Sequence, residues 1–174
     1  MLEKDNIRLG AIEPEDIDFI LEMENNSDLW HLSNTHNPFS RFDIEQYVML
    51  ADKDVFSAKQ LRLLIIDRKT EIRIGIIDIF DFDAYNKRAG VGVLIVENQR
   101  NKGVASTAMD ILIEYAFQQL NIHQLYCNIN IDNKKSINLF EKKGFIRTGL
   151  KKDWNIINNR FVDVCLYQLI NENQ

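Results

Sequence analysis

One stretch of this sequence limits the possible folds more than any other, because a strand pattern changes into a helix pattern within a few residues. Residues 89–96 read AGVGVLIV, an apolar run typical of a buried strand. After a short polar turn, apolar side chains recur at steps of three and four, at Ala105, Met109, Leu112, Ala116 and Leu120. That spacing predicts an amphipathic helix. Residues 124–131 then alternate apolar and polar side chains, so we expect a crossover between parallel strands.

The remaining patterns place further elements around this crossover. Helices are predicted to begin at Pro14 and at Ser40, where Ser40 and Asp43 resemble a capping box. A short helix over residues 133–142 is expected to end at Gly144. The other expected strands are residues 6–12, 61–66, 72–80, 145–150 and 161–169. We therefore predict one α+β domain, residues 1–174, with a mixed, mostly antiparallel sheet of seven strands.

Composition narrows the class of protein. The chain has 174 residues, and no stretch approaches the roughly 18 apolar residues of a membrane span. Its first residues lack the pattern of a signal peptide, so we expect a cytoplasmic protein without a membrane partner. The net charge of −5 disfavours nucleic acid as a partner. Cys127 and Cys165 lie in apolar alternating segments without metal-ligand spacing, which predicts reduced core thiols and no metal.

The turn before the predicted helix has the features of a phosphate site. A helix start exposes unpaired N–H groups and the positive end of the helix dipole. Gly103 permits an unusual φ and close approach of a ligand to the backbone, and Arg100 and Lys102 add positive charge. The same residues also fit an ordinary strand-to-helix loop with solvated charges, and composition and spacing leave both interpretations open.

Two motifs in this region resemble those of a known family. Arg100-x-x-Gly103-x-Ala105 after an apolar strand is similar to the acetyl-CoA pyrophosphate loop of the GNAT superfamily of N-acetyltransferases. Residues 133–145, NKKSINLFEKKGF, resemble the second signature of that family. The likeness extends over nearly the whole chain, and its carboxyl-terminal part is similar to the branch with ribosomal-protein and spermidine or diamine N-acetyltransferases.

This resemblance implies a fold and a cosubstrate. The GNAT fold has helices on both faces of the sheet and splayed parallel strands at the cofactor site, with acetyl-CoA as cosubstrate. The implied contacts to the pantetheine arm come from the backbone of Val93, Leu94 and Ile95 and from the side chain of Asn133, which also fits a helix N-cap. Phe140 is implied at the same site. The implied pyrophosphate contacts are Arg100, Asn101, Lys102, Gly103, Val104 and Ala105.

The sequence departs from the family where the usual acid and base would stand. Many relatives have a carboxylate base at the position of Gly90 and a tyrosine acid at the position of Phe140, and neither residue here can exchange a proton. Strand alternation makes Asp78 the best remaining candidate for a base or an ammonium anchor. A hydrogen-bonded acidic residue at a sheet surface is the alternative interpretation of Asp78.

Acceptor and partners follow from the same resemblance. The loop between the first two helices, with Trp30, His31 and His36, is implied at the acceptor site. We expect transfer of acetyl to a primary amine of a small molecule, diamine- or polyamine-like, or of a protein amino terminus. Because Gly90 and Phe140 lack acid and base chemistry, a catalytically weak module that senses acetyl-CoA is the alternative. A homodimer is a further possibility implied by the branch.

Overall fold

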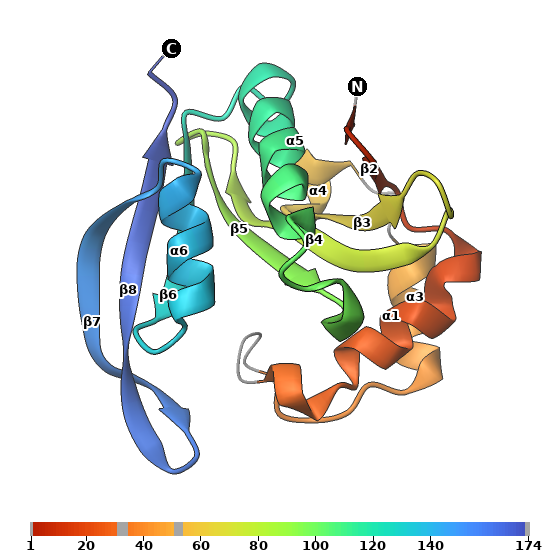
Figure 1. Ribbon diagram of the computed structural model, residues 1–174, viewed down its shortest axis with the longest axis horizontal. Coiled ribbons are helices and arrows are strands. Elements are labelled where there is room, and N and C mark those ends of the chain that lie inside the picture. Colours follow the sequence, from red (N-terminus) through yellow and green to blue (C-terminus); the bar gives the residue numbers. More distant parts are fainter. Residues whose placement is uncertain (1, 31–34, 51–53, 173–174) are drawn as a thin grey trace.

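The computed structural model describes residues 2–30, 35–50 and 54–172, and within them the chain forms a single eight-stranded sheet in the order β1-β2-β3-β4-β5-β6-β8-β7 (Figure 1). The β5 and β6 strands are parallel, and each of the other neighbouring pairs is antiparallel. The strands are β1 (Glu3–Lys4), β2 (Ile7–Gly10), β3 (Leu61–Asp67), β4 (Arg73–Asp83), β5 (Arg88–Ile95), β6 (Gln124–Asn130), β7 (Ile146–Ile157) and β8 (Arg160–Ile170).

Helices cover both faces of this sheet. The α5 and α6 helices lie over one face, and α1 and α3 pack on each other over the opposite one (Figure 1). The helices are α1 (Ile17–Glu24), α3 (Arg41–Met49), α4 (Val55–Ala58), α5 (Val104–Gln118) and α6 (Lys134–Lys142). Ser40 and Asp43 form the predicted capping box at the start of α3, where the Ser40 hydroxyl accepts a hydrogen bond from the Asp43 N–H.

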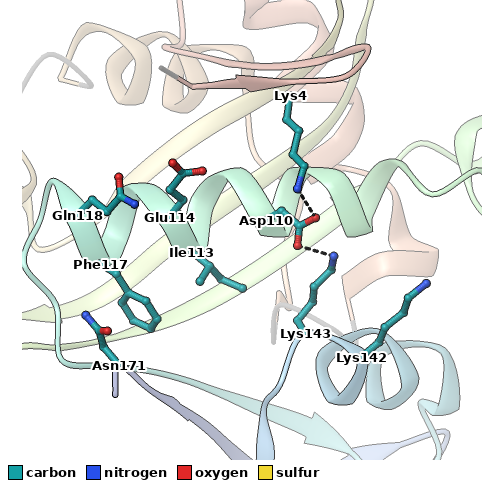
Figure 2. Close-up of a pocket in the computed structure, with 9 residues that line it drawn as sticks. All are labelled: Lys4, Asp110, Ile113, Glu114, Phe117, Gln118, Lys142, Lys143 and Asn171. Atoms are coloured by element: carbon teal, nitrogen blue, oxygen red, sulfur yellow. Dashed lines mark hydrogen bonds and ion pairs between the residues drawn. The ribbon is translucent and has the colours of Figure 1, made fainter. Parts of the chain in front are cut away.

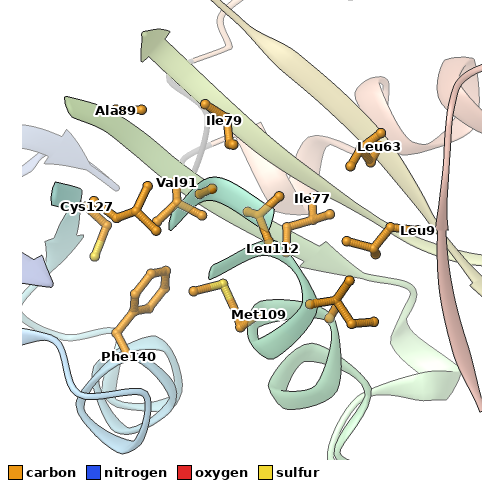
Figure 3. Close-up of a cluster of buried hydrophobic side chains, with 14 of the residues drawn as sticks. Leu9, Leu63, Ile77, Ile79, Ala89, Val91, Met109, Leu112, Cys127 and Phe140 are labelled. Carbon is orange, nitrogen blue, oxygen red and sulfur yellow. The ribbon is translucent and has the colours of Figure 1, made fainter. Parts of the chain in front are cut away.

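Two apolar layers hold the sheet and helices together. On the α5 face, Leu63, Ile77 and Ile79 pack against Met109 and Leu112 of α5, and all five are buried (Figure 3). Side chains of a strand point alternately to opposite faces, so the neighbours of these residues enter the second layer. That layer joins Leu64 and Ile76 of the sheet to Ile20 of α1 and Ile44 of α3. Burial on both faces explains why β3 and β4 read as continuous apolar runs.

The structure corrects several predicted boundaries. The two-residue β1 strand adds an eighth strand to the seven expected, and the four-residue α4 was too short to show a period. The β4 strand continues past Phe80 through an irregular register to Asp83, so the turn expected from Asp81 is confined to residues after Asp83. The β7 strand runs to Ile157 rather than 150, because it pairs with β8 across a bulge while both of its faces are largely exposed, which hides the alternation. No helix in the described part of the chain is long and apolar enough to cross a membrane.

Candidate active site

The parallel pair at the centre of the sheet opens into a cavity. Pairing between β5 and β6 runs from Arg88 opposite Gln124 to Gly90 opposite Tyr126 and then stops. Beyond that point lies a cavity of about 780 Å³, which we call the central cleft. Val93 and Leu94 line it from β5, and Cys127 and Asn128 line it from β6. The β5 backbone is therefore free of its parallel neighbour where the sequence implied contacts to a pantetheine arm, and Ile95, one residue further, is buried.

The start of α5 has the geometry expected of an anion site. Gly103 is the N-cap, with φ of 82° and no side-chain cap, and a β-carbon added there would meet nothing within 4 Å. The turn before Gly103 is tied to the end of β5, because the Arg100 Nε donates a 2.9 Å hydrogen bond to the Ile95 carbonyl oxygen. Lys102 contacts Gln99, and Val104 is buried against the core. The N–H groups of the first turn thus lie beside an open exposed surface, as a phosphate ligand requires.

The second signature supplies one wall of the central cleft. The Asn133 side chain caps α6 by accepting a 3.1 Å hydrogen bond from the Ser136 N–H, and both residues line the cleft. The N-cap interpretation of Asn133 is confirmed, while its contact with a cosubstrate stays a prediction. Phe140 also lines the cleft and is only 4% exposed, with its ring edge-on to Phe145 at 5.0 Å between centroids. Burial raises the pKa of the neighbouring Cys127 thiol, so this thiol stays protonated.

A group of charged side chains around one guanidinium lines the cleft near α1 and α3. Arg62 and Asp78 are cross-strand partners, and Arg62 donates Nε–H···Oδ1 and Nη2–H···Oδ2 bonds of 2.7 and 3.1 Å to Asp78. A second ion pair joins Arg62 to Glu24 at the end of α1. The guanidinium also lies 5.5 Å from the ring centroid of Tyr47 in α3. Burial raises the pKa of Tyr47, so its ring is neutral above this cation. We call Glu24, Arg62 and Asp78 the charged triad.

An aromatic pair lies at the point where β5 and β6 separate. Phe80 lines the cleft, and its ring meets Tyr126 edge-on at 6.2 Å between centroids. The Tyr126 hydroxyl donates a 3.1 Å hydrogen bond to Asp81 instead of pointing into the cleft. Burial and the Asp81 charge raise the pKa of Tyr126 to about 12, which makes this hydroxyl a poor acid at neutral pH. Gly90 lies beneath the Phe80 ring, with no side chain of its own.

The acceptor loop contributes other residues than those expected. Thr35 and Phe39 line the central cleft, whereas Trp30 and His36 do not. The Trp30 indole N–H instead donates to the Glu24 carbonyl oxygen at 2.8 Å, which ties Trp30 to the last residue of α1. His36 is exposed, and His31 lies outside the described residues. The assignment of these three residues to an acceptor site therefore stays a prediction.

The carboxyl-terminal hairpin adds a wall that sequence reasoning missed. Trp154 and Asn155 of β7 line the cleft, and the Asn155 side chain donates a 2.8 Å hydrogen bond to Asn130 of β6. The Lys151 ammonium lies 4.7 Å from the Trp154 ring centroid. Register could have linked Arg62 to Asp78 once the hairpin was recognised, but no local signal brings α1 or β7 to the same cavity.

Comparison with known proteins agrees with this geometry. The profile of the acetyltransferase (GNAT) domain matches residues 6–146. The chain belongs to this acetyltransferase family. It is therefore an acetyl-CoA-dependent N-acetyltransferase with the GNAT fold, as the two motifs predicted.

Individual relatives of this GNAT enzyme include two named acetyltransferases. The spermidine N(1)-acetyltransferase of Vibrio cholerae is 26% identical over 161 residues, covering 91% of this chain and 89% of that protein. The ribosomal-protein-serine acetyltransferase of Escherichia coli is 27% identical over 113 residues, 65% of this chain and 63% of that protein. A crystal structure of the Vibrio cholerae spermidine N-acetyltransferase with CoA and spermine superposes with a TM-score of 0.86 at 24% identity over 96% of each chain.

The GNAT domain has a second hollow away from the central cleft. It measures about 740 Å³ and lies where Lys4, α5, the end of α6 and Asn171 meet (Figure 2). Asp110 accepts hydrogen bonds from Lys143 at 2.5 Å and from Lys4 at 3.1 Å. None of its lining residues lines the central cleft, so this ion-pair cluster ties β1 and the end of α6 to α5 away from the transfer site.

Proposed function

We propose that this GNAT enzyme acetylates a primary amine of a small, cationic molecule of the diamine or polyamine type. The observation that carries the proposal is the charge of the central cleft. Among the residues that the structure describes, three carboxylates, those of Glu24, Asp43 and Asp78, line it against one guanidinium, that of Arg62. Such a cleft attracts an ammonium-bearing acceptor and repels an anionic one. The spermidine acetyltransferases among the relatives are consistent with this choice.

Acetyl-CoA fits the other half of the cleft. The stretch of β5 that pairs with β4 but not with β6, Val93 to Ile95, offers backbone groups to the amides of a pantetheine arm, and the start of α5 offers N–H groups to the pyrophosphate. The Gly103 surface is open, so a phosphate can approach the backbone there without meeting a side chain. Asn133 lines the same cleft at the start of α6. When bound, acetyl-CoA supplies the thioester whose acetyl carbon a neutral amine attacks.

The residues of this chain act mainly through charge and shape. Gly90 and Phe140 cannot exchange protons, so the amine must lose its proton to water or to another side chain, directly or through water. Asp78 keeps its role as the proposed ammonium anchor, since both of its oxygens already accept bonds from Arg62 and a held carboxylate attracts cations. The thiolate of CoA leaves readily without an acid because a thiol of pKa about 8.5 is a tolerable leaving group at neutral pH.

A panel of acceptors tests the function. Release of free CoA is measured with acetyl-CoA and, in turn, a short diamine, spermidine, a simple monoamine, an amino acid and a peptide with a free amino terminus. We expect turnover with the diamine or spermidine to exceed that with the amino acid, whose carboxylate the cleft repels. Faster turnover of the peptide than of any small amine would overturn the acceptor assignment. Binding of acetyl-CoA without turnover of any acceptor would instead support the sensing module.

Self-association and location complete the proposal. The β7 strand lies at the end of the sheet, and exposed apolar side chains gather on this hairpin, among them Ile146, Ile156 and Phe161. An unpaired strand edge with apolar side chains favours pairing with a second copy, and one structure of the Vibrio cholerae enzyme is dodecameric. We propose a homo-oligomer, which light scattering tests directly. We also propose a cytoplasmic location, in keeping with the free, buried thiols Cys127 and Cys165.

A further inference from the structure

We propose that Arg62 sets how many positive charges the acceptor carries, by acting as an internal cation in the place where a second ammonium of a longer polyamine would bind. The proposal rests on the proposed function, because it concerns the acceptor half of the central cleft. It deepens that function from cationic amines in general to short diamines, with one ammonium beyond the reacting nitrogen, in preference to triamines.

The first step of the argument is that Arg62 is fixed in place. Its side chain is 24% exposed, and three of its N–H groups are donated to carboxylates from two different elements, Asp78 of β4 and Glu24 of α1. A bidentate guanidinium–carboxylate pair is directional as well as strong. The Tyr47 ring lies over the guanidinium from a third element, α3. The cation is therefore part of the wall of the cleft and is not a mobile surface charge.

The second step is the net charge of the triad, which Arg62 neutralises only in part. Glu24 and Asp78 carry two negative charges, and the guanidinium cancels one, so the charged triad has a net charge of −1. Both carboxylates are three-quarters or more buried, at 17% and 25% side-chain exposure, so salt and water screen this charge only partly. Asp43 adds a third carboxylate at the cleft, but it is exposed and engaged in the cap of α3, which lowers its pKa through bonds from Ser40.

The third step is the position that the guanidinium occupies in the cleft. Phe80 lines the cleft two residues further along the same face of β4 than Asp78, and Trp154 lines it from the terminal hairpin. One ammonium can be matched by the single net charge, whereas a second ammonium would meet the guanidinium. Repulsion of the wrong ligand is a common source of specificity, and a fixed like charge is its simplest form.

Substitutions that change the net charge of the triad in single steps test the proposal. Arg62→Met keeps an unbranched side chain and changes the net charge from −1 to −2. The double variant Arg62→Met with Asp78→Asn returns the charge to −1 without the guanidinium. Glu24→Gln leaves the Arg62–Asp78 pair in place and makes the triad neutral. Arg62→Lys keeps the charge and loses the bidentate geometry.

The measured quantity is selectivity, defined as kcat/KM for spermidine divided by kcat/KM for 1,3-diaminopropane, at saturating acetyl-CoA. We expect selectivity below one in the wild type, a rise of about tenfold in Arg62→Met, and a return to within about threefold of the wild type in the double variant. Glu24→Gln should lower kcat/KM for both amines, and for spermidine more. The gain in Arg62→Met should shrink as salt is raised.

Several outcomes would overturn the proposal. Unchanged selectivity in Arg62→Met, or a double variant that keeps the selectivity of Arg62→Met, would assign Arg62 a structural role. If Arg62→Met does not fold, as judged by its circular dichroism and acetyl-CoA affinity, Arg62→Gln makes the same change of charge with a polar side chain, and unchanged selectivity in that variant would likewise assign Arg62 a structural role. A wild type that turns over none of these amines removes the proposed function together with this inference, whereas turnover with unaltered selectivity removes the inference alone.

Discussion

Phe80 and Gly90 are cross-strand partners, and the Phe80 ring fills the space in which a side chain at position 90 would stand. A β-carbon built on Gly90 would come within 2.2 Å of the ring carbon Cε2. The carboxylate that many GNAT relatives carry at this position is thus excluded here by the packing of an aromatic ring from the neighbouring strand. The acidic side chains that line the cleft stand at other positions, Glu24, Asp43 and Asp78.

Because the Phe80 ring occupies the space beside Gly90, we expect a side chain at position 90 to destabilise the fold. We expect Gly90→Ala to lower the free energy of unfolding by about 1–3 kcal/mol, because the methyl group must displace the Phe80 ring. Gly92→Ala is the control, since its β-carbon would meet Phe80 only at an ordinary 3.7 Å. Urea unfolding measures both. In a Phe80→Ala background the cost of Gly90→Ala should fall, and an unchanged cost there would refute the contact as its cause.

The open surface at Gly103 predicts where the pyrophosphate binds. Acetyl-CoA should raise the Tm of the wild type, and Gly103→Glu should abolish the rise, since a carboxylate at the helix start repels phosphate. Gly103→Asn is the matched neutral control, because asparagine tolerates the positive φ of 82° found there. Thermal scans with and without acetyl-CoA compare the three proteins. If Gly103→Glu kept the full rise in Tm, the loop would not be part of the cofactor site.

We expect a tyrosine at position 140 to leave the activity of the enzyme intact. Phe140→Tyr adds the hydroxyl that relatives use as an acid while keeping the edge-on contact with Phe145. We expect kcat to equal that of the wild type or to exceed it modestly, because thiolate departure needs little assistance. Steady-state release of CoA measures the effect. Loss of activity in a folded Phe140→Tyr protein would show that the ring has a further role in the cleft.

We expect removal of the Asp78 charge to weaken acceptor binding without changing cosubstrate binding. Asp78→Asn makes the triad neutral, so kcat/KM for a diamine should fall by about three- to tenfold through KM, with the acetyl-CoA Kd unchanged. A general base would behave differently, because its loss typically costs about 10²–10⁴-fold in kcat. A large loss of kcat that high pH restores would therefore identify Asp78 as the base, and wild-type kinetics at every pH would make it structural.

We expect Asp110 to make a pH-dependent contribution to the free energy of unfolding. Burial opposes its charge, but hydrogen bonds from Lys143 and Lys4 and their positive charges outweigh burial and lower the pKa of the Asp110 carboxyl (Figure 2). A depressed folded pKa stabilises the protein above the unfolded value of about 3.9, and this contribution is lost as the pH falls through the folded pKa.

Asp110→Asn should therefore lower the free energy of unfolding at pH 7 by up to about 1 kcal/mol, with a smaller difference from the wild type near pH 3. Urea unfolding at the two pH values measures this, and the exposed Asp132→Asn provides the control. An equal difference at pH 7 and pH 3 would mean that the charge of Asp110 does not contribute.

Much of the architecture was predictable because it follows local periodicity. The apolar run of residues 89–96, the change to helical spacing after Gly103 and the Asn133 cap each depend on neighbouring residues alone, and each is found in the structure. The edge strand β7 was predicted too short for the same reason, since a strand exposed on both faces has no alternation to detect.

The sequence by itself determined the family, the order of the elements and the place of the helix start with its positive-φ glycine, because motifs and periods lie within short stretches of chain. Only the tertiary structure decided which charges meet in the cleft. Glu24 and Arg62 are 38 residues apart, and Trp154 reaches the same cavity from the terminal hairpin. Strand register alone pairs Arg62 with Asp78, but packing of α1 on the sheet adds the second carboxylate. Long-range packing brings these side chains together, and no local pattern records it.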